Sequence, residues 1–155
     1  MKRYALILSL VLALTAGFGC AKKSAESTGY DDGMNADLRS AIQQITDGKI
    51  YFNFDKFDIK PEYKNVLKNK AEIMKAHPSI RVRIEGNCDE RGTVEYNLAL
   101  GERRAQAAYD YLTQLGVNPG QMEKVSFGKE NPAVQGSSES AWQQNRRDEF
   151  RVVSH

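Results

Sequence analysis

The sequence predicts an α/β (α+β) domain of two layers, in which helices pack on one face of a mixed sheet. Strand-like and helix-like segments alternate in the order βαβαβ-αβ between residues 48 and 155. The second strand-like segment, residues 80–85, alternates apolar and charged side chains, which indicates one buried and one solvated sheet face. Because only the buried face can hold helices, we expect two layers.

The first strand is predicted at residues 50–54, where isoleucine and two phenylalanines share one face. Pro61 suits the first turn of a helix that runs to Ala76. We expect this helix to stop before Pro78, because the residue that precedes a proline avoids the α region.

The longest helix is predicted to begin after an N-cap at Thr93 and to end at Gly116. A third strand is expected at residues 122–127, a short helix near Ser140 and a last strand at residues 150–153. Spacings of three and four residues predict one core stripe on the longest helix, made of Leu98, Gly101, Ala105, Ala108, Leu112 and Leu115.

Length and composition bound the function. A chain of 155 residues suits one domain with appendages. Its 22 basic and 20 acidic residues give a net charge of +2, which argues against a nucleic-acid binder. Two cysteines are too few for a disulfide scaffold, and their distance from the two histidines argues against a zinc cluster. We expect no metal and no cofactor.

The first 19 residues have the pattern of an export signal. Lys2 and Arg3 precede an uncharged apolar run over residues 5–14, and small residues follow. This run is shorter than the roughly 20 residues that a spanning helix needs. The alternative is a buried N-terminal helix, but such helices rarely begin with two cations.

Cys20 directly follows Gly19 and resembles the lipidated cysteine of a bacterial lipobox, although Gly17 stands where leucine is usual. Acyl chains on Cys20 would hold the protein on a membrane. Ordinary secretion is the alternative, with Cys20 free or disulfide-bonded to Cys88. Residues 20–47 are predicted to be the lipidated N-terminus and a flexible tether, in which residues 36–45 could form a short amphipathic helix.

A longer motif runs from Gly86 to Ala105 and contains the pattern D-x-x-G-x-x-x-x-N-x-x-L-x-x-x-R-A. Companion stretches lie at residues 51–55, 127–132 and 145–150. Together they resemble the OmpA-like peptidoglycan-binding domain over residues 48–153, and within that family the peptidoglycan-associated lipoproteins of the Tol–Pal system. The motif differs from the common family pattern at Asn87 and Cys88.

The resemblance implies noncovalent binding of peptidoglycan through diaminopimelate, whose free end bears an ammonium and a carboxylate on one carbon. In the family, positions matching Asp89 and Arg104 bind these two groups. A loop residue and a residue on the following helix can face one ligand, because a carboxylate attracts the ammonium and a guanidinium fork suits a carboxylate. The further binding positions that the resemblance implies are Phe54, Asp55, Asn97 and Leu100.

The resemblance also implies a location and partners. It predicts an outer-membrane lipoprotein, anchored in lipid through Cys20, whose domain faces the periplasm and also binds TolB during constriction at cell division. One alternative is a peptidoglycan hydrolase or amidase, for which we find no nucleophile–base pair or metal site in the sequence. Another is a wall-anchoring OmpA-like lipoprotein outside Tol–Pal. A third is a MotB-like stator, which would need an N-terminal spanning helix.

Simpler roles compete at several of these positions. Asp89 could cap a turn and Arg104 could be a solvated helix cation, and for Asn97 and Asp55 a structural role competes evenly with a ligand role. The full motif favours binding, so we expect Asp89→Ala and Arg104→Ala to abolish wall binding and leave the fold intact. Arg146 and Arg147 are expected to form internal salt bridges or to be surface charges rather than ligand contacts, and Cys88 is expected to be a small buried filler.

Overall fold

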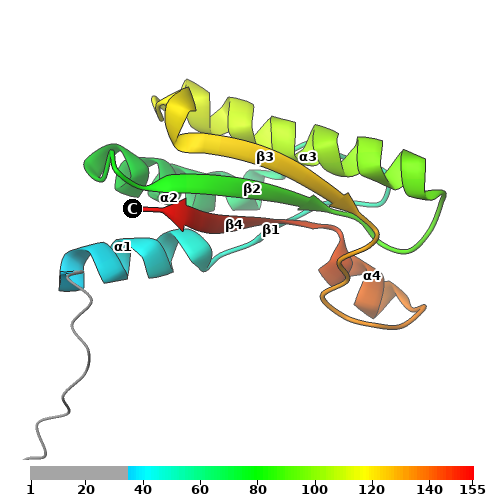
Figure 1. Cartoon of the computed structure of the whole chain (residues 1–155). Helices are drawn as coiled ribbons and strands as arrows, with labels where there is room; N and C mark the ends of the chain where they lie inside the picture. Colours follow the sequence, from blue (N-terminus) through cyan, green and yellow to red (C-terminus); the bar gives the residue numbers. More distant parts are fainter. Residues whose placement is uncertain (1–34) are drawn as a thin grey trace, which may run out of the picture. The chain divides into compact units, whose positions relative to one another are not determined.

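Four strands form one mixed sheet in the order β1-β4-β2-β3 (Figure 1). Strand β2 (Arg81–Asn87) runs parallel to β3 (Met122–Gly128). Strand β4 (Arg147–Ser154) runs antiparallel to both β2 and β1 (Ile50–Tyr51). The computed structural model describes residues 35–155, so the expectations for the export signal, Cys20 and the start of the tether lie outside the described residues.

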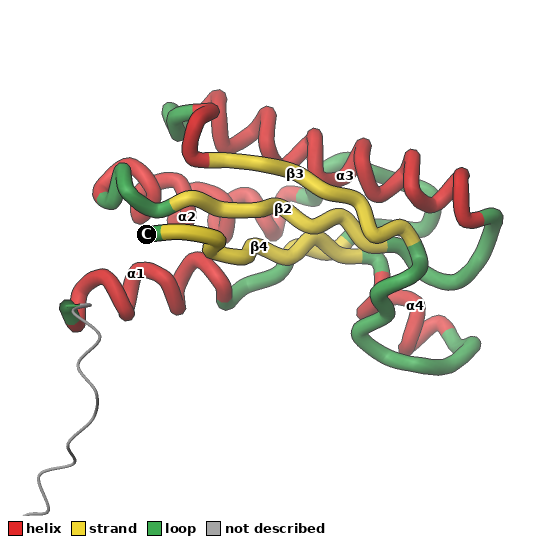
Figure 2. The backbone as a smooth tube through the Cα atoms, in the orientation of Figure 1, coloured by secondary structure: helices red, strands yellow, loops and turns green. Residues whose placement is uncertain are grey.

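Within residues 35–155, four α-helices accompany the sheet: α1 (Ala36–Thr46), α2 (Lys64–Ala76), α3 (Val94–Gln114) and α4 (Glu139–Asn145) (Figure 2). Helices α1, α2 and α3 contribute to one core on one sheet face, which confirms the predicted two layers. No helix within residues 35–155 has the length and apolar character to cross a membrane. The core contains Ala41, Ile45, Leu67, Met74, Ile84, Ala105, Leu112 and Phe150.

The opposite face of the sheet is polar, as the alternation in the second strand predicts. The carboxylate of Glu85 lies between two guanidinium groups, 2.8 Å from Arg83 Nη2 and 3.1 Å from Arg151 Nε. The side chain of Arg151 is 59% exposed. This face therefore contacts solvent through a row of ion pairs.

Helix α1 corrects the expected extent of the flexible tether. Ala41 and Ile45 lie one turn apart and are both buried in the core. The ammonium of Lys70 on α2 donates to the backbone oxygens of Ile45 and Asp47 and so caps the end of α1. Burial lowers the pKa of this ammonium to about 8. Residues 36–46 are thus part of the folded unit, which begins before residue 48.

The first strand is shorter than predicted, because the chain turns directly after Phe52. Lys56 N donates to Asn53 O over 3.2 Å, and Asp55 adopts a left-handed backbone with φ of 56°. Phe54 is 57% exposed, so its apolar character does not reflect core packing. This turn becomes one wall of the candidate site.

Helix α3 begins and ends as expected, but its first turns bury other side chains than predicted. Leu98 is exposed, whereas Gly101 packs so closely on Gly86 of β2 that a Cβ atom on either glycine would overlap the other backbone. The predicted stripe is correct from Gly101 to Leu112, continues with the partly buried Leu115 against the core, and is wrong at Leu98. Towards the start of α3 the buried face consists of Asn97, Leu100 and Arg104.

Candidate ligand-binding site

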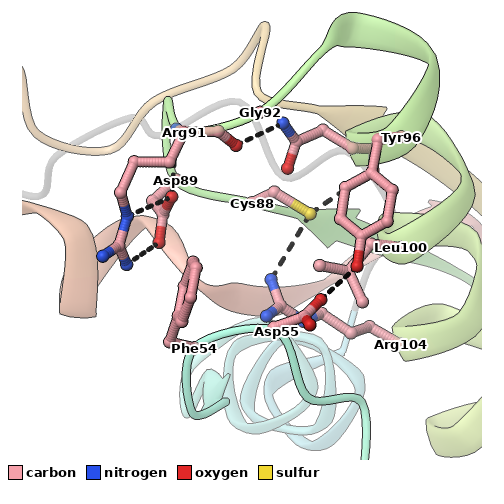
Figure 3. A pocket seen from close by; sticks show the side chains of 10 residues that line it. Phe54, Asp55, Cys88, Asp89, Arg91, Gly92, Tyr96, Leu100 and Arg104 are labelled. Atoms are coloured by element: carbon pink, nitrogen blue, oxygen red, sulfur yellow. Dashed lines mark hydrogen bonds and ion pairs between the residues drawn. The ribbon is translucent and has the colours of Figure 1, made fainter.

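A pocket of about 240 Å³ opens at the end of the sheet where β2 ends and α3 begins. We call this end of the sheet the pocket end; β2 and β3 both point towards it, and α4 lies beside it (Figure 1). All six residues that the resemblance implies for binding line the pocket (Figure 3). The full lining is Phe54, Asp55, Cys88, Asp89, Arg91, Gly92, Tyr96, Asn97, Leu100 and Arg104.

Asp89 lies two residues beyond β2 and is only 4% exposed. Its Oδ1 atom accepts from the backbone N and the Nε of Arg91, both at 3.1 Å. Its Oδ2 atom accepts from Arg91 Nη2 at 2.7 Å and from Arg146 Nη1 at 3.2 Å. Burial opposes the charge of Asp89, but these hydrogen bonds outweigh burial and hold the pKa of the carboxyl below its ordinary value.

Arg104 is completely buried beneath the pocket. Its Nε donates to Lys56 O at 2.8 Å, and its Nη2 donates to Asn53 O at 3.2 Å. Its Nη1 donates to Asn87 O at 2.8 Å and contacts Cys88 Sγ at 3.4 Å. Burial lowers the pKa of Arg104, yet a guanidinium stays charged because its ordinary value is far above neutral.

The contacts of Arg104 correct two ideas from the sequence. It is no solvated helix cation, because it joins the turn after β1 to the end of β2. Its removal would also leave the backbone oxygens of Asn53, Lys56 and Asn87 without this donor, so the expectation of an intact fold in Arg104→Ala is withdrawn. One of the two hydrogens on Nη2 is not used by these contacts.

The loop between β2 and α3 is held by side chains on both sides. Asn97 Nδ2 donates to Arg91 O at 2.8 Å and to Thr93 O at 3.0 Å. Lys129 Nζ donates to Gly92 O at 2.7 Å. Gly92 has φ of 91°, a left-handed conformation that other residues rarely adopt. Asn97 therefore orders the loop that presents Asp89.

Aromatic rings form the outer part of the site. The Arg91 guanidinium carbon lies 3.9 Å from the ring centre of Phe54 and 4.0 Å from that of Trp142. The Tyr96 hydroxyl donates to the Asp55 carboxylate, and this hydrogen bond raises the pKa of Tyr96. Phe54 and Asp55 thus belong to the pocket wall, as the resemblance implies.

Three other expectations for side chains near the pocket are confirmed. Arg146 makes internal contacts with Phe52 O at 3.0 Å and with Glu139 Oε1 at 2.6 Å. Arg147 pairs with Glu149 at 2.7 Å. Cys88 is buried, and burial raises the pKa of its thiol to about 11.

Asp148 is a buried acid that the sequence analysis did not single out. It lies on β4 between Ile50 of β1 and Gly86 of β2, and it is fully buried. Within residues 35–155, neither of its carboxylate oxygens has a hydrogen-bond partner. Burial raises the pKa of this carboxyl well above its ordinary value, although the positive charge of Arg104 acts against the rise.

Sequence reasoning also missed Arg91 and Trp142. Arg91 stands inside the motif, two residues after Asp89, and this spacing is the one available signal for their contact. Trp142 comes from α4, far along the chain, so only the fold brings it to the site. No group of three or more histidine, cysteine, aspartate or glutamate residues is placed to hold a metal within the described part of the chain.

The chemistry of the site is that of charge recognition. A buried carboxylate and a buried guanidinium line one small pocket, with apolar and aromatic side chains around them. Fixed opposite charges in a pocket with apolar and aromatic walls attract a ligand that bears both charges. Fold and site together define an α/β domain with one small pocket lined by opposite charges.

Comparison with known proteins gives the family. Residues 51–146 match the model of the OmpA family. The peptidoglycan-associated lipoprotein of Pseudomonas putida is 40% identical, over 97% of this chain and 98% of its own length. The peptidoglycan-associated lipoprotein of Haemophilus influenzae is 51% identical over 63% of this chain and 64% of its own. The chain belongs to the OmpA family, among the peptidoglycan-associated lipoproteins.

Solved structures agree with this placement. The peptidoglycan-associated lipoprotein from Burkholderia pseudomallei superposes with a TM-score of 0.67 and 42% identity, over 79% of this chain and 97% of that one. The C-terminal domain of Helicobacter pylori MotB has a TM-score of 0.65 at 24% identity, over 70% and 85% of the two chains. At that identity the MotB likeness concerns the fold alone.

Proposed function

We propose that the domain binds peptidoglycan noncovalently, by holding the free end of diaminopimelate in the stem peptide. The observation that supports this most directly is the carboxylate of Asp89, charged and 4% exposed, in the same small pocket as Arg104. Charged groups are rarely buried without a partner or a task, because their desolvation is costly. A ligand with an ammonium and a carboxylate on one carbon matches this pair of charges.

In this proposal each part of the ligand has its own contact. Asp89 accepts hydrogen bonds from the ammonium. The ligand carboxylate faces the unused Nη2 hydrogen of Arg104 and the positive end of α3, whose N-cap is Thr93. Phe54 and Leu100 cover the methylene chain of the diaminopimelate.

The names of the relatives support a wider role for this chain as an outer-membrane lipoprotein. Cys20 bears the acyl chains, residues after it form the tether, and the domain lies in the periplasm. Within the Tol–Pal system the same protein exchanges between the wall and TolB, which helps the outer membrane constrict during division. A pull-down from cross-linked cells tests this role, and a sample without TolB would contradict it.

The lipid anchor has its own test. Replacing the cysteine in Cys20→Ala should convert a membrane-bound protein into a soluble periplasmic one, because no acyl chain is left to enter the bilayer. Mass spectrometry of the wild type should find an acylated Cys20. An unmodified mature Cys20 would contradict the anchor.

Wall binding is tested by co-sedimentation of the full chain with purified sacculi. We expect Asp89→Asn to reduce binding by about tenfold to a hundredfold, since a lost charge-assisted contact costs roughly 1.5–3 kcal/mol. Asp110→Asn is the matched control, because Asp110 is an exposed acid on α3 that does not line the pocket. Equal binding by Asp89→Asn and the wild type would refute the site.

The same experiment tests the enzymatic alternative. We expect the sacculi to stay intact, with no soluble muropeptides in the supernatant. If muropeptides appeared with the wild type and not with Asp89→Asn, the protein would be a wall hydrolase and the binding proposal would be wrong.

A further inference from the structure

The binding carboxylate of the pocket is already occupied by the protein itself. A carboxylate offers about four acceptor positions. In Asp89 they receive the backbone N, Nε and Nη2 of Arg91, and Nη1 of Arg146. The pair of Arg91 and Asp89 closes one side of the pocket (Figure 3). A ligand ammonium must therefore replace one of these donors.

The two arginines differ in how firmly they are held. Arg146 has a side chain that is 6% exposed, and it is fixed by Phe52 O and Glu139 as well as by Asp89. Arg91 is 30% exposed, and apart from Asp89 its guanidinium contacts the rings of Phe54 and Trp142. Arg91 is therefore the donor that can leave, whereas Arg146 stays.

We propose that Arg91 is a built-in competitor of the ligand, a cation that fills the ammonium site until the ligand displaces it. This inference rests on the proposed function, since it concerns the same carboxylate. While Arg91 is paired with Asp89, its Nη2 lies 2.7 Å from Asp89 Oδ2, which is the distance that a bound ammonium would adopt. The two aromatic rings hold the guanidinium in this position.

Competition of this kind has a definite thermodynamic consequence. Only molecules with an open Asp89 can bind, so the observed affinity is the intrinsic affinity reduced by the open fraction. The competitor keeps Asp89 paired when no ligand is bound, and thus avoids an uncompensated buried charge. Arg91 thereby weakens the binding of any single stem peptide and keeps that binding reversible.

Trp142 provides a direct reporter of this exchange. It is the only tryptophan in the chain, and its ring lies 4.0 Å from the guanidinium carbon of Arg91. Its Nε1 donates to Glu90 at 3.0 Å, which keeps the ring beside the loop. Departure of Arg91 removes a cation from the ring, so the fluorescence of Trp142 should change on binding.

The experiment measures the affinity of the full chain for free meso-diaminopimelate by calorimetry, with the fluorescence of Trp142 as a second signal. Arg91→Met removes the charge and keeps an unbranched side chain beside the rings. We expect it to bind about tenfold more tightly than the wild type. The wild-type fluorescence should move on binding towards that of ligand-free Arg91→Met.

Arg103→Met is the matched control, because Arg103 is an exposed cation on α3 with no contact to Asp89. We expect it to bind as the wild type does. An equal gain in both variants would overturn the competitor and indicate a general effect of charge. Weaker or unchanged binding by Arg91→Met would also overturn it; if Asp89→Asn still lost binding, the proposed function would stand. If neither the wild type nor any variant bound meso-diaminopimelate, both the competitor and the proposed function would be wrong.

Discussion

The centre of the sheet and its pocket end bury side chains of opposite character. Under the three helices the buried side chains are mostly apolar, with Leu67, Ile84 and Leu112 completely enclosed. At the pocket end the buried groups include charged ones, among them Arg104 and Asp89. Burial of aliphatic surface stabilises the fold by about 25 cal/mol per Å², whereas burial of charge is costly unless hydrogen bonds offset it.

This difference indicates where stability and function lie in the molecule. The helix-covered centre has few polar groups that could bind a ligand, and its apolar packing stabilises the fold. The pocket end keeps charges that an apolar replacement would avoid, and it satisfies them with backbone oxygens and ion pairs. We infer that these charges are retained for the ligand, so changes in the two regions should separate binding from stability.

The largest effect is expected for Arg104→Ala, which should damage both properties. It removes the donor of three backbone oxygens and leaves Asp148 without the nearby positive charge. Loss of one member of a buried charged cluster should lower the free energy of unfolding by about 4 kcal/mol. Chemical denaturation measures this loss. A fully stable variant that merely fails to bind sacculi would show that Arg104 has no structural part.

A somewhat smaller loss of stability is expected for Leu67→Ala, in the centre. The cavity left by a completely buried leucine should lower the free energy of unfolding by about 3 kcal/mol. Under conditions where the variant is folded, binding to sacculi should equal that of the wild type, because Leu67 is not in the pocket lining. A matching loss of binding by the folded variant would remove the distinction between the two regions.

The smallest effect concerns Asp148 and depends on pH. Burial raises the pKa of this carboxyl in the folded state above the 3.8 of an exposed aspartate. Its contribution to stability is therefore full at low pH and is lost as pH rises through the folded pKa. The free energy of unfolding of Asp148→Asn should exceed that of the wild type by about 1 kcal/mol near pH 7. This difference should shrink towards about pH 4. Denaturation at several pH values measures it, and a constant difference would contradict this assignment.

Much of the fold was predictable because local pattern and tertiary packing agree. The alternation in residues 80–85 predicts the two faces of β2, and the proline and glycine positions predict the helix ends. The prediction failed at Leu98 and Phe54, which are apolar but exposed. These two flank the pocket end, where side chains serve a site as well as a core. Periodicity also identified α1 as a helix but not its docking, which depends on Lys70 and the core.

The residues of the candidate site could be predicted from the sequence, but the contacts between them could not. The motif names Asp89 and Arg104, and the structure places both in one pocket lining. The motif alone does not show that Arg104 faces backbone oxygens or that Arg91 covers Asp89, because both contacts depend on the turn after β1 and on side-chain rotamers. The place of Trp142 at the site could not be predicted from the sequence, because α4 is far from the loop along the chain and only the fold brings the two together.

The central claim is that one pocket selects a ligand with both charges, and competition for sacculus-bound protein tests it most directly. Full-length protein on sacculi is challenged with meso-diaminopimelate, with cadaverine, which lacks the carboxylates, or with pimelate, which lacks the ammonium groups. We predict release by meso-diaminopimelate alone, because Asp89 and Arg104 must both be engaged. Equal release by cadaverine or by pimelate would contradict the account.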